Sequence, residues 1–267
     1  MSQVRAFLST PKGYTLAALL VLTAIGSSQP EAYKGWINTA AAVGAAVLVD
    51  LGFAQLQQRR NIVFPDGAVL TGLIVALVLS TMVPWYLCAF TAAIAILSKH
   101  LLKVQRRPVF NPAAFGLVVT ILAFSTAQSW WGGLSMLPAW CIAFLVIAGM
   151  LVTARVNKFP AVFAYLGVYF SLLLVAGLFH ISGAGEALRA PFLHSVLFLS
   201  FMMVTDPPTS PARYMDQVWF GTLAAAICVM VYLLVGGLYF YLLGLLVANA
   251  WNAWRSFSAQ AARQNHV

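Results

Sequence analysis

Long apolar runs separated by short polar stretches dominate the hydrophobic pattern of this 267-residue chain. The strands of a membrane barrel would alternate apolar and polar residues, and these runs do not. In lipid the backbone polar groups must be satisfied internally, which a helix achieves within one segment. The pattern therefore predicts an all-α, polytopic membrane protein with about ten transmembrane helices, at residues 13–29, 36–54, 67–83, 84–101, 112–128, 136–153, 160–180, 190–204, 217–235 and 238–254.

Several of these runs are near the lower limit of about 17 residues for crossing the hydrocarbon core of a bilayer. The run at 190–204 is shorter still, so a broken or half-inserted helix is expected there. Pro84 separates two runs with almost no loop between them, and Gly236-Gly237 separates the last two. Both breaks predict tight helical hairpins.

Composition and charge agree with a membrane protein. The chain is 62% hydrophobic and 8% charged, with a mean hydropathy of +0.89, whereas soluble domains carry about 25% charged residues. The net charge of +9 lies in short loops, a pattern that indicates membrane orientation rather than nucleic-acid binding. With the N-terminus inside, every Lys and Arg except Lys34 and Arg189 faces the cytoplasm. We therefore expect an inner-membrane protein with both termini cytoplasmic.

The first run has two interpretations. Arg5 and Lys12, the apolar stretch Thr15–Ile25 and the small residues that follow it also fit a cleaved signal peptide. Ten spans, unlike nine, divide into two halves of five, which must then have opposite orientations. We therefore favour a retained helix and two inverted five-helix repeats, with a cytoplasmic segment at 1–12, the repeats at 13–128 and 136–254, and a cytoplasmic tail at 255–267.

Ionisable residues at membrane depth are costly, so each is a candidate for function. Asp50, Asp66 and Asp206 are the acidic residues that do not fall in solvated loops. Asp50 lies about one turn inside the second run, near Arg59 and Arg60, where pairing at the interface and function explain it equally well. Asp66 directly precedes a helix, so we expect it to serve as an N-cap whatever else it does.

The stretch Val204–Pro211 contains three prolines, which exclude a regular helix there. Irregular backbone near membrane depth needs shelter from protein or from a water-filled cavity. Either this stretch is a capped cytoplasmic loop, or its oxygens meet a cation, a polar ligand or nearby amides; the side chains concerned are Thr205, Asp206, Thr209 and Ser210. Asn111-Pro112 forms a second polar break on the same side and predicts a helix start.

The sequence gives little support for a metal site, a disulfide, a haem site or a hydrolytic active site. Cysteines occur singly in apolar runs, so iron–sulfur, zinc and disulfide interpretations lack a ligand pattern. His180 and His194 flank an outer loop, but haem ligation is not expected without further support. Phosphate-binding loops and hydrolase motifs do not occur, so the chain is at most an electron-carrying subunit of an enzyme. Tryptophans at the run ends are predicted as interfacial anchors, namely Trp36, Trp85, Trp130, Trp131, Trp251 and Trp254.

Several motifs, in order, resemble the RnfD/NqrB family of membrane subunits of Rnf and sodium-pumping NADH:quinone oxidoreductase complexes. Asp66-Gly67-Ala68 with Leu70-Thr71-Gly72-Leu73 resembles its DGSA…LTGLLLAL segment. Lys99-His100 with Asn111-Pro112-Ala113 is similar to its KH…NPFNPA segment, and Phe201–Pro211 to its FFMATDPVTSP. Asn249 falls where the family has an Asn late in the last helix. The resemblance covers roughly residues 40–255.

The resemblance implies two inverted five-helix repeats, similar also to urea channels, with a site between them. It implies a part in transmembrane electron transfer, with or without coupled ion movement, among other redox subunits of a larger complex. The cofactor expected is a noncovalent flavin, either FMN or riboflavin. Candidate residues for the site or pathway are Asp50, Asp66, Thr71, Asn111, Thr205, Asp206, Thr209 and Asn249.

One departure from the family concerns covalent flavin. Family members usually carry a Ser-Gly-Ala-Thr segment whose threonine takes FMN, whereas the SGA string here is Ser182-Gly183-Ala184-Gly185 and lacks that threonine. We therefore expect a compact member without covalent FMN. Two alternatives remain open, a channel or carrier for an ion or small polar solute, and a structural scaffold subunit of a redox complex. The visible absorbance of the purified protein separates the first interpretation from these.

Overall fold

The computed structural model describes residues 7, 9–28, 32–57, 65–104 and 107–264. Each of the ten predicted apolar runs corresponds to one α-helix in this part of the chain. The helices are α2 (Pro11–Gly26), α3 (Ala32–Leu56), α4 (Asp66–Val78), α5 (Trp85–Leu101), α6 (Pro112–Phe124), α7 (Ile142–Val156), α8 (Phe159–Leu178), α9 (Phe192–Met202), α10 (Tyr214–Val235) and α11 (Phe240–Gln264).

The connections are short and mostly irregular. A small antiparallel pair of two-residue strands, β1 (Lys103–Val104) and β2 (Arg107–Pro108), lies between α5 and α6, and the other elements of the described chain are helices, in keeping with the all-α prediction. Single 3-10 turns occur at η1 (Trp131–Gly133), η2 (Ala139–Cys141) and η3 (Glu186–Leu188).

Four helical segments are long and apolar enough to cross a bilayer, at Tyr33–Leu56, Ala139–Val156, Phe159–Leu178 and Tyr214–Val235. The helices α2, α4, α5, α6 and α9 are apolar but shorter. At 1.5 Å per residue, the 13 residues of α4 and the 11 of α9 reach only about 20 Å and 17 Å, against a hydrocarbon core of about 30 Å. The helix α6, with 13 residues, is as short as α4. The fold is that of a polytopic membrane protein in which these three helices are shorter than the hydrocarbon core is thick.

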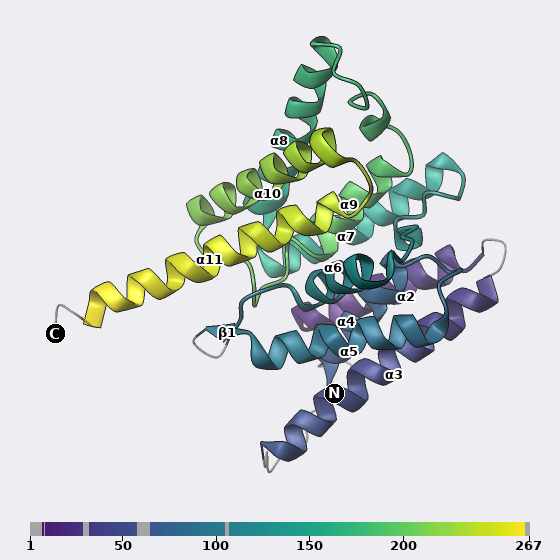
Figure 1. Ribbon diagram of the computed structural model, residues 1–267, viewed down its shortest axis with the longest axis vertical. Helices are drawn as coiled ribbons and strands as arrows, with labels where there is room; N and C mark the ends of the chain where they lie inside the picture. The colour runs from purple at the N-terminus through teal and green to yellow at the C-terminus, as the bar shows by residue number, and fades with distance from the viewer. Residues whose placement is uncertain (1–6, 8, 29–31, 58–64, 105–106, 265–267) are drawn as a thin grey trace.

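The two halves of the chain lie side by side, the purple and blue half below the green and yellow half in Figure 1. In the first half α3 packs extensively on α4 and α5, and α5 on α6. In the second half α8 packs on α10, and α10 on α11. Contacts between α2 and α7 and between α6 and α11 join the halves.

Glycines let three of these helix pairs approach closely. A Cβ at Gly116 in α6 would lie 2.5 Å from the Thr91 carbonyl of α5, and one at Gly244 in α11 would lie 2.5 Å from the Ala224 carbonyl of α10. A Cβ at Gly221 in α10 would lie 2.3 Å from the Ala161 carbonyl of α8. Small residues permit such close backbone approach, which drives association where lipid gives no hydrophobic force between helices.

The C-terminal end of α4 is buried, so its last carbonyl groups need partners. The segment 126–131, folded back beside it, supplies them. The Ser129 and Trp130 amides donate to the Val78 carbonyl at 3.2 and 3.1 Å, and the Trp131 indole donates to the Ala76 carbonyl at 2.6 Å. The Ser80 amide returns a bond to the Ala127 carbonyl at 3.1 Å. The carbonyl groups of Ala76 and Val78 are therefore paired although the helix ends inside the protein.

Three sequence predictions are wrong in detail. The tight hairpin expected at Pro84 is a six-residue connection, because α4 ends at Val78 and α5 begins at Trp85. Trp130 and Trp131 are not interfacial anchors, since they are 0% and 3% exposed and pack inside. Asp66 is not the N-cap of α4, because Pro65 occupies that position and Asp66 is the first helical residue. The predicted break at Gly236-Gly237 is confirmed, with φ of 77° and 79°.

Candidate functional site

A cavity of about 560 Å³ opens where α4, α6 and the end of α9 meet. Five of the eight predicted residues line it, and they come from three separate parts of the chain: Asp66, Thr71, Asn111, Thr205 and Asp206. Apolar side chains, including Leu70, Ile74, Val156 and Met202, form much of the remaining wall. A mainly apolar pocket with a few converging polar groups is the usual form of a small-molecule site.

Two of the polar residues present acceptors to the cavity. The Thr71 hydroxyl donates to the Gly67 carbonyl at 2.8 Å, and the Thr205 hydroxyl donates to the Phe201 carbonyl at 2.6 Å. Each bond joins residues four apart in sequence, so the hydroxyl hydrogen stays within the local backbone. The oxygen lone pairs are left for another group. A ligand N–H is the complement of this arrangement.

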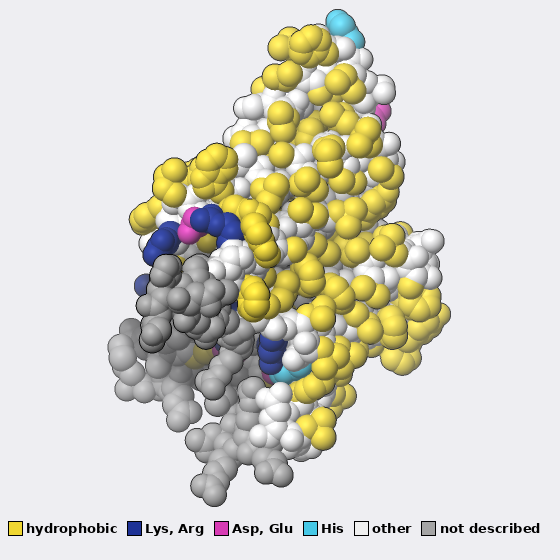
Figure 2. All heavy atoms as spheres, turned by 60° about the vertical axis from the view of Figure 1, so that its left-hand side comes forward, with side chains coloured by type: hydrophobic (Ala, Val, Ile, Leu, Met, Phe, Trp, Pro, Cys, Tyr) yellow, Lys and Arg dark blue, Asp and Glu magenta, His cyan; other side chains and the backbone are white. Residues whose placement is uncertain are grey.

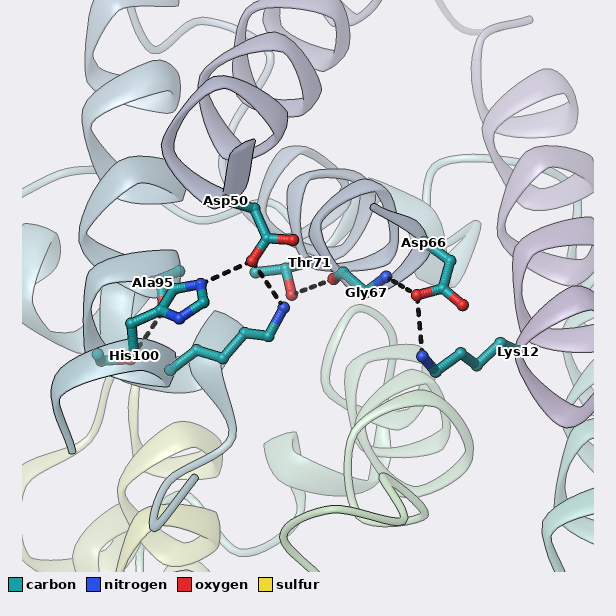
Figure 3. Close-up of polar contacts among 9 residues, drawn as sticks. Lys12, Asp50, Asp66, Gly67, Thr71, Ala95 and His100 are labelled. Atoms are coloured by element: carbon teal, nitrogen blue, oxygen red, sulfur yellow. Dashed lines mark hydrogen bonds and ion pairs between the residues drawn. The ribbon is translucent and has the colours of Figure 1, made fainter. Parts of the chain in front are cut away.

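Basic side chains also line the cavity, and sequence reasoning did not select them. Lys12 of α2, Lys99 of α5 and Arg107 of β2 reach it. In Figure 3 Lys12 points toward Asp66, and the Lys12 Nζ to Asp66 Oδ1 distance is 2.8 Å. Asp66 Oδ1 also accepts a hydrogen bond from the Gly67 amide at 2.6 Å. Asp66 is thus held by an ion pair and a backbone amide at the first turn of α4.

Asp50 does not line the cavity but supports one of its walls. Its Oδ1 lies 3.0 Å from Lys99 Nζ and 2.7 Å from His100 Nε2, at the opposite side of Figure 3 from Lys12. The ring of Phe53 stacks on that of His100 with centroids 4.4 Å apart. Asp50 therefore orients Lys99, and its predicted neighbours Arg59 and Arg60 lie outside the described residues.

Asn249 and Thr209, also predicted, join the two polar breaks beside the cavity. The Asn249 side chain accepts from the Asn111 amide at 2.9 Å and donates to the Thr209 carbonyl at 3.3 Å. Asn111 accepts from the Ala114 amide at 3.1 Å, which confirms the predicted cap of α6, and its Nδ2 donates to the Met203 carbonyl at 3.4 Å. The start of α6, the end of α9 and α11 are thereby fixed to one another.

Asp206 lies in the connection after α9, with its carboxylate facing partly buried surroundings. Thr209 donates to Asp206 Oδ2 at 2.8 Å. Burial raises the pKa of Asp206 to about 6, although the Thr209 hydrogen bond and the nearby Lys158, Lys12 and Lys99 act to lower it. Burial likewise lowers the pKa of Lys158 to about 8, and its ammonium donates to the carbonyls of Ser210 and Pro211.

Replacing Asp206 with Asn should remove a pH-dependent part of the stability. The folded protein holds the Asp206 proton up to about pH 6, while the unfolded chain releases it near pH 3.9. The native state therefore binds more protons between these values, and this contribution to stability falls as the pH rises through 6. Lys158 titrates above that window. The melting temperature of Asp206→Asn, minus that of the wild type in the same detergent, should rise between pH 5 and pH 7. A difference that stays constant would contradict the prediction.

The cavity ends inside the protein. On α4 the cavity-lining residues stop at Ile74. Beyond this point lies an apolar cluster that we term the plug, formed by Leu77 of α4 together with Trp130, Trp131 and Phe198. Each member is at most 3% exposed. A Cβ at Gly132 would lie 2.8 Å from Leu77 Cβ and 2.9 Å from the Phe198 ring, so the plug is tightly packed.

Basic residues gather at the end of the protein where the cavity opens. Arg155 bonds the Ser9 carbonyl, Arg255 pairs with Asp216 at 2.8 Å, and Lys12, Lys99 and Arg107 line the cavity. Figure 2 shows basic side chains toward the left and the lower middle of the visible face, whereas its upper part and right-hand side are mostly hydrophobic. This distribution agrees with the charge asymmetry on which the topology prediction is based.

Comparison with known proteins finds a family match over the first half of the chain. Residues 8–137 match the model of the NQR2, RnfD, RnfE family. A 102-residue stretch is 29% identical to a subunit of the ion-translocating oxidoreductase complex of Yersinia enterocolitica. Over residues 8–137 the chain is therefore similar to the RnfD/NqrB family, as its motifs predicted, and its apolar helices are those of a multi-pass integral membrane protein. The aligned stretch spans 37% of this chain and 29% of that relative's length.

Proposed function

We propose that the protein is an integral membrane subunit of an ion-translocating oxidoreductase complex and takes part in transmembrane electron transfer. The family supports this proposal, because the Yersinia relative is named as a subunit of such a complex. The observation that carries it is the cavity between the broken helices α4 and α9, into which five separately predicted residues converge. Other redox subunits are the expected partners.

We further propose that the cavity holds a noncovalent flavin. Its volume of about 560 Å³ lies within the range of roughly 300–1,000 Å³ for small-molecule pockets. Leu70, Ile74 and Met202 offer apolar surface for a flat ring system, while Thr71 and Thr205 would accept hydrogen bonds from a ring N–H. A bound flavin would supply storage of electrons. The polypeptide would position it and exclude water from its deeper side.

The arrangement of helices supports the proposed inverted repeat. In the first half the fifth residue of the last helix, Gly116, packs against the preceding helix α5, and in the second half the fifth residue of the last helix, Gly244, packs against α10. The third helix of each half, α4 or α9, is short, with 13 and 11 residues. Sites in inverted-repeat proteins lie where such discontinuous helices meet. A channel or carrier would use the same centre but would need the plug to open.

The purified protein should show a flavin absorbance band. After the protein is denatured and small molecules are removed, the polypeptide should no longer show this band. The band is expected because the cavity fits a flavin, and its release is expected because the Ser-Gly-Ala-Thr acceptor motif is absent. The measurement is an absorbance spectrum followed by in-gel fluorescence of the denatured chain. A colourless protein, isolated together with its partner subunits, would favour the channel or scaffold interpretation. A fluorescent band in the gel would indicate another acceptor hydroxyl.

Both termini should be cytoplasmic, because the basic residues then lie on the inner side. A phosphatase reporter fused after Val267 or after Arg60 should be inactive, and the same reporter fused after Gly185 should be active. An active fusion after Val267 would contradict the ten-span arrangement.

A further inference from the structure

The mouth of the cavity carries an excess of positive charge. Lys12, Lys99 and Arg107 line it against the two carboxylates of Asp66 and Asp206. Asp66 is already paired with Lys12, and burial disfavours the charged form of Asp206. Lys99 and Arg107 therefore dominate the side of the cavity that is formed by α5 and β2.

Of the three basic residues at the cavity mouth, Arg107 has the fewest polar interactions with the described residues. Among the described residues its guanidinium forms no ion pair and no hydrogen bond. Other basic residues at the same end of the protein are engaged, as Arg155 is with the Ser9 carbonyl and Arg255 with Asp216. A guanidinium offers five donors in a planar fork that suits phosphate oxygens.

The Lys99 ammonium has more hydrogen-bond donors than its contact with Asp50 uses. Its ammonium uses one hydrogen bond on Asp50, and Asp50 Oδ1 is shared with His100. An ammonium group has three donors. Gly67 opposite it has no side chain, and a Cβ there would lie 3.4 Å from Lys99 Nζ. The ammonium is thus held at the cavity wall close to the first turn of α4, with the Lys99 side chain 27% exposed.

We propose that Arg107 and Lys99 form a binding site for an anionic phosphate group of the cavity's ligand. This inference rests on the proposed flavin-binding function, and it makes the ligand FMN rather than the uncharged riboflavin. The phosphate would sit at the mouth of the cavity, and the ring system would lie deeper, toward Thr71 and Ile74. The apolar inner wall and the basic mouth match the two ends of that molecule.

The test is a fluorescence-quenching titration of the purified, flavin-depleted chain with FMN and with riboflavin. Charge-assisted hydrogen bonds contribute about 1.5–3 kcal/mol, so wild-type protein should bind FMN at least about tenfold more tightly than riboflavin. Arg107→Gln should weaken FMN binding, leave riboflavin binding unchanged and bring the ratio close to one. Arg155→Gln is the matched control, because Arg155 lies outside the cavity lining, and it should retain the wild-type ratio.

A second measurement separates failure of this inference from failure of the proposed function. Inorganic phosphate, compared with chloride at equal ionic strength, should raise the melting temperature of the wild type more than that of Arg107→Gln. Equal affinities of the wild type for FMN and riboflavin would overturn the phosphate site and leave the flavin function standing. If neither flavin binds, the proposed flavin function is wrong. The phosphate site is then supported if inorganic phosphate raises the melting temperature of the wild type more than that of Arg107→Gln, and contradicted if it does not.

Discussion

Replacing Gly221 with Leu should destabilise the protein more than any other substitution considered. The first added atom, Cβ, would lie 2.3 Å from the Ala161 carbonyl and 3.0 Å from the Tyr165 amide nitrogen. Both are backbone atoms of α8, so relief requires α8 and α10 to move apart along their extensive contact. Overpacking usually costs 1–3 kcal/mol and occasionally more, and we expect about 3 kcal/mol or more here. The measurement is the melting temperature in detergent and the yield of monodisperse protein.

Gly167→Leu is the matched control for Gly221→Leu. Gly167 lies on α8 itself, and a Cβ there would meet nothing within 4 Å. The control should fold with a melting temperature close to that of the wild type. Equal losses in the two variants would show that helical glycine as such, rather than the close approach of α8 and α10, is responsible.

Replacing Asn249 with Leu should produce the second large effect. Leu keeps the branched shape of Asn but cannot accept the hydrogen bond of the Asn111 amide, which would be left buried without a partner. An unsatisfied buried group costs about 1–3 kcal/mol. The same change releases the start of α6 from α11, so it should also weaken ligand binding in the cavity. Thermal unfolding measures the first effect, and flavin titration the second.

Asn252→Leu provides the comparison for Asn249→Leu. Asn252 also donates to the Thr209 carbonyl, at 3.0 Å, but Asn249 donates to the same carbonyl and would remain. The loss of stability should be below about 1 kcal/mol, since no buried group becomes unpaired. If the two variants lost the same stability, the Asn111 amide would not be the reason for the effect at position 249.

Much of the architecture could be predicted from the sequence because a helix in lipid leaves a strong local signal. The ten apolar runs became ten helices, and Asn111-Pro112 capped and opened α6 as its residue types indicate. The broken stretch Val204–Pro211 is irregular, since its prolines cannot continue a helix. Five of the eight candidate residues line one cavity because such polar breaks need shelter from lipid and find it against one another.

The remaining features depend on contacts that no local pattern encodes. Trp130 and Trp131 stand at the end of an apolar run like interfacial anchors, yet they fold inward because the end of α4, which lies far earlier in the chain, needs donors for its carbonyls. The sequence does not distinguish Lys12, Lys99 and Arg107 from the other basic residues of the loops. Only their three-dimensional placement shows that they turn toward a cavity.

The plug has a consequence for leakage. An unpaired ion passing through the cluster of Leu77, Trp130, Trp131 and Phe198 would leave water for a buried region lined by these large apolar side chains, at an effective cost of several kcal/mol. The two indole N–H groups do not relieve this cost, because Gln128 and the Ala76 carbonyl already bind them. In a bilayer, this centre would hold an ion gradient while its cavity stays open on one side. Any ion that the proposed complex moves would then take another route or require these four side chains to separate.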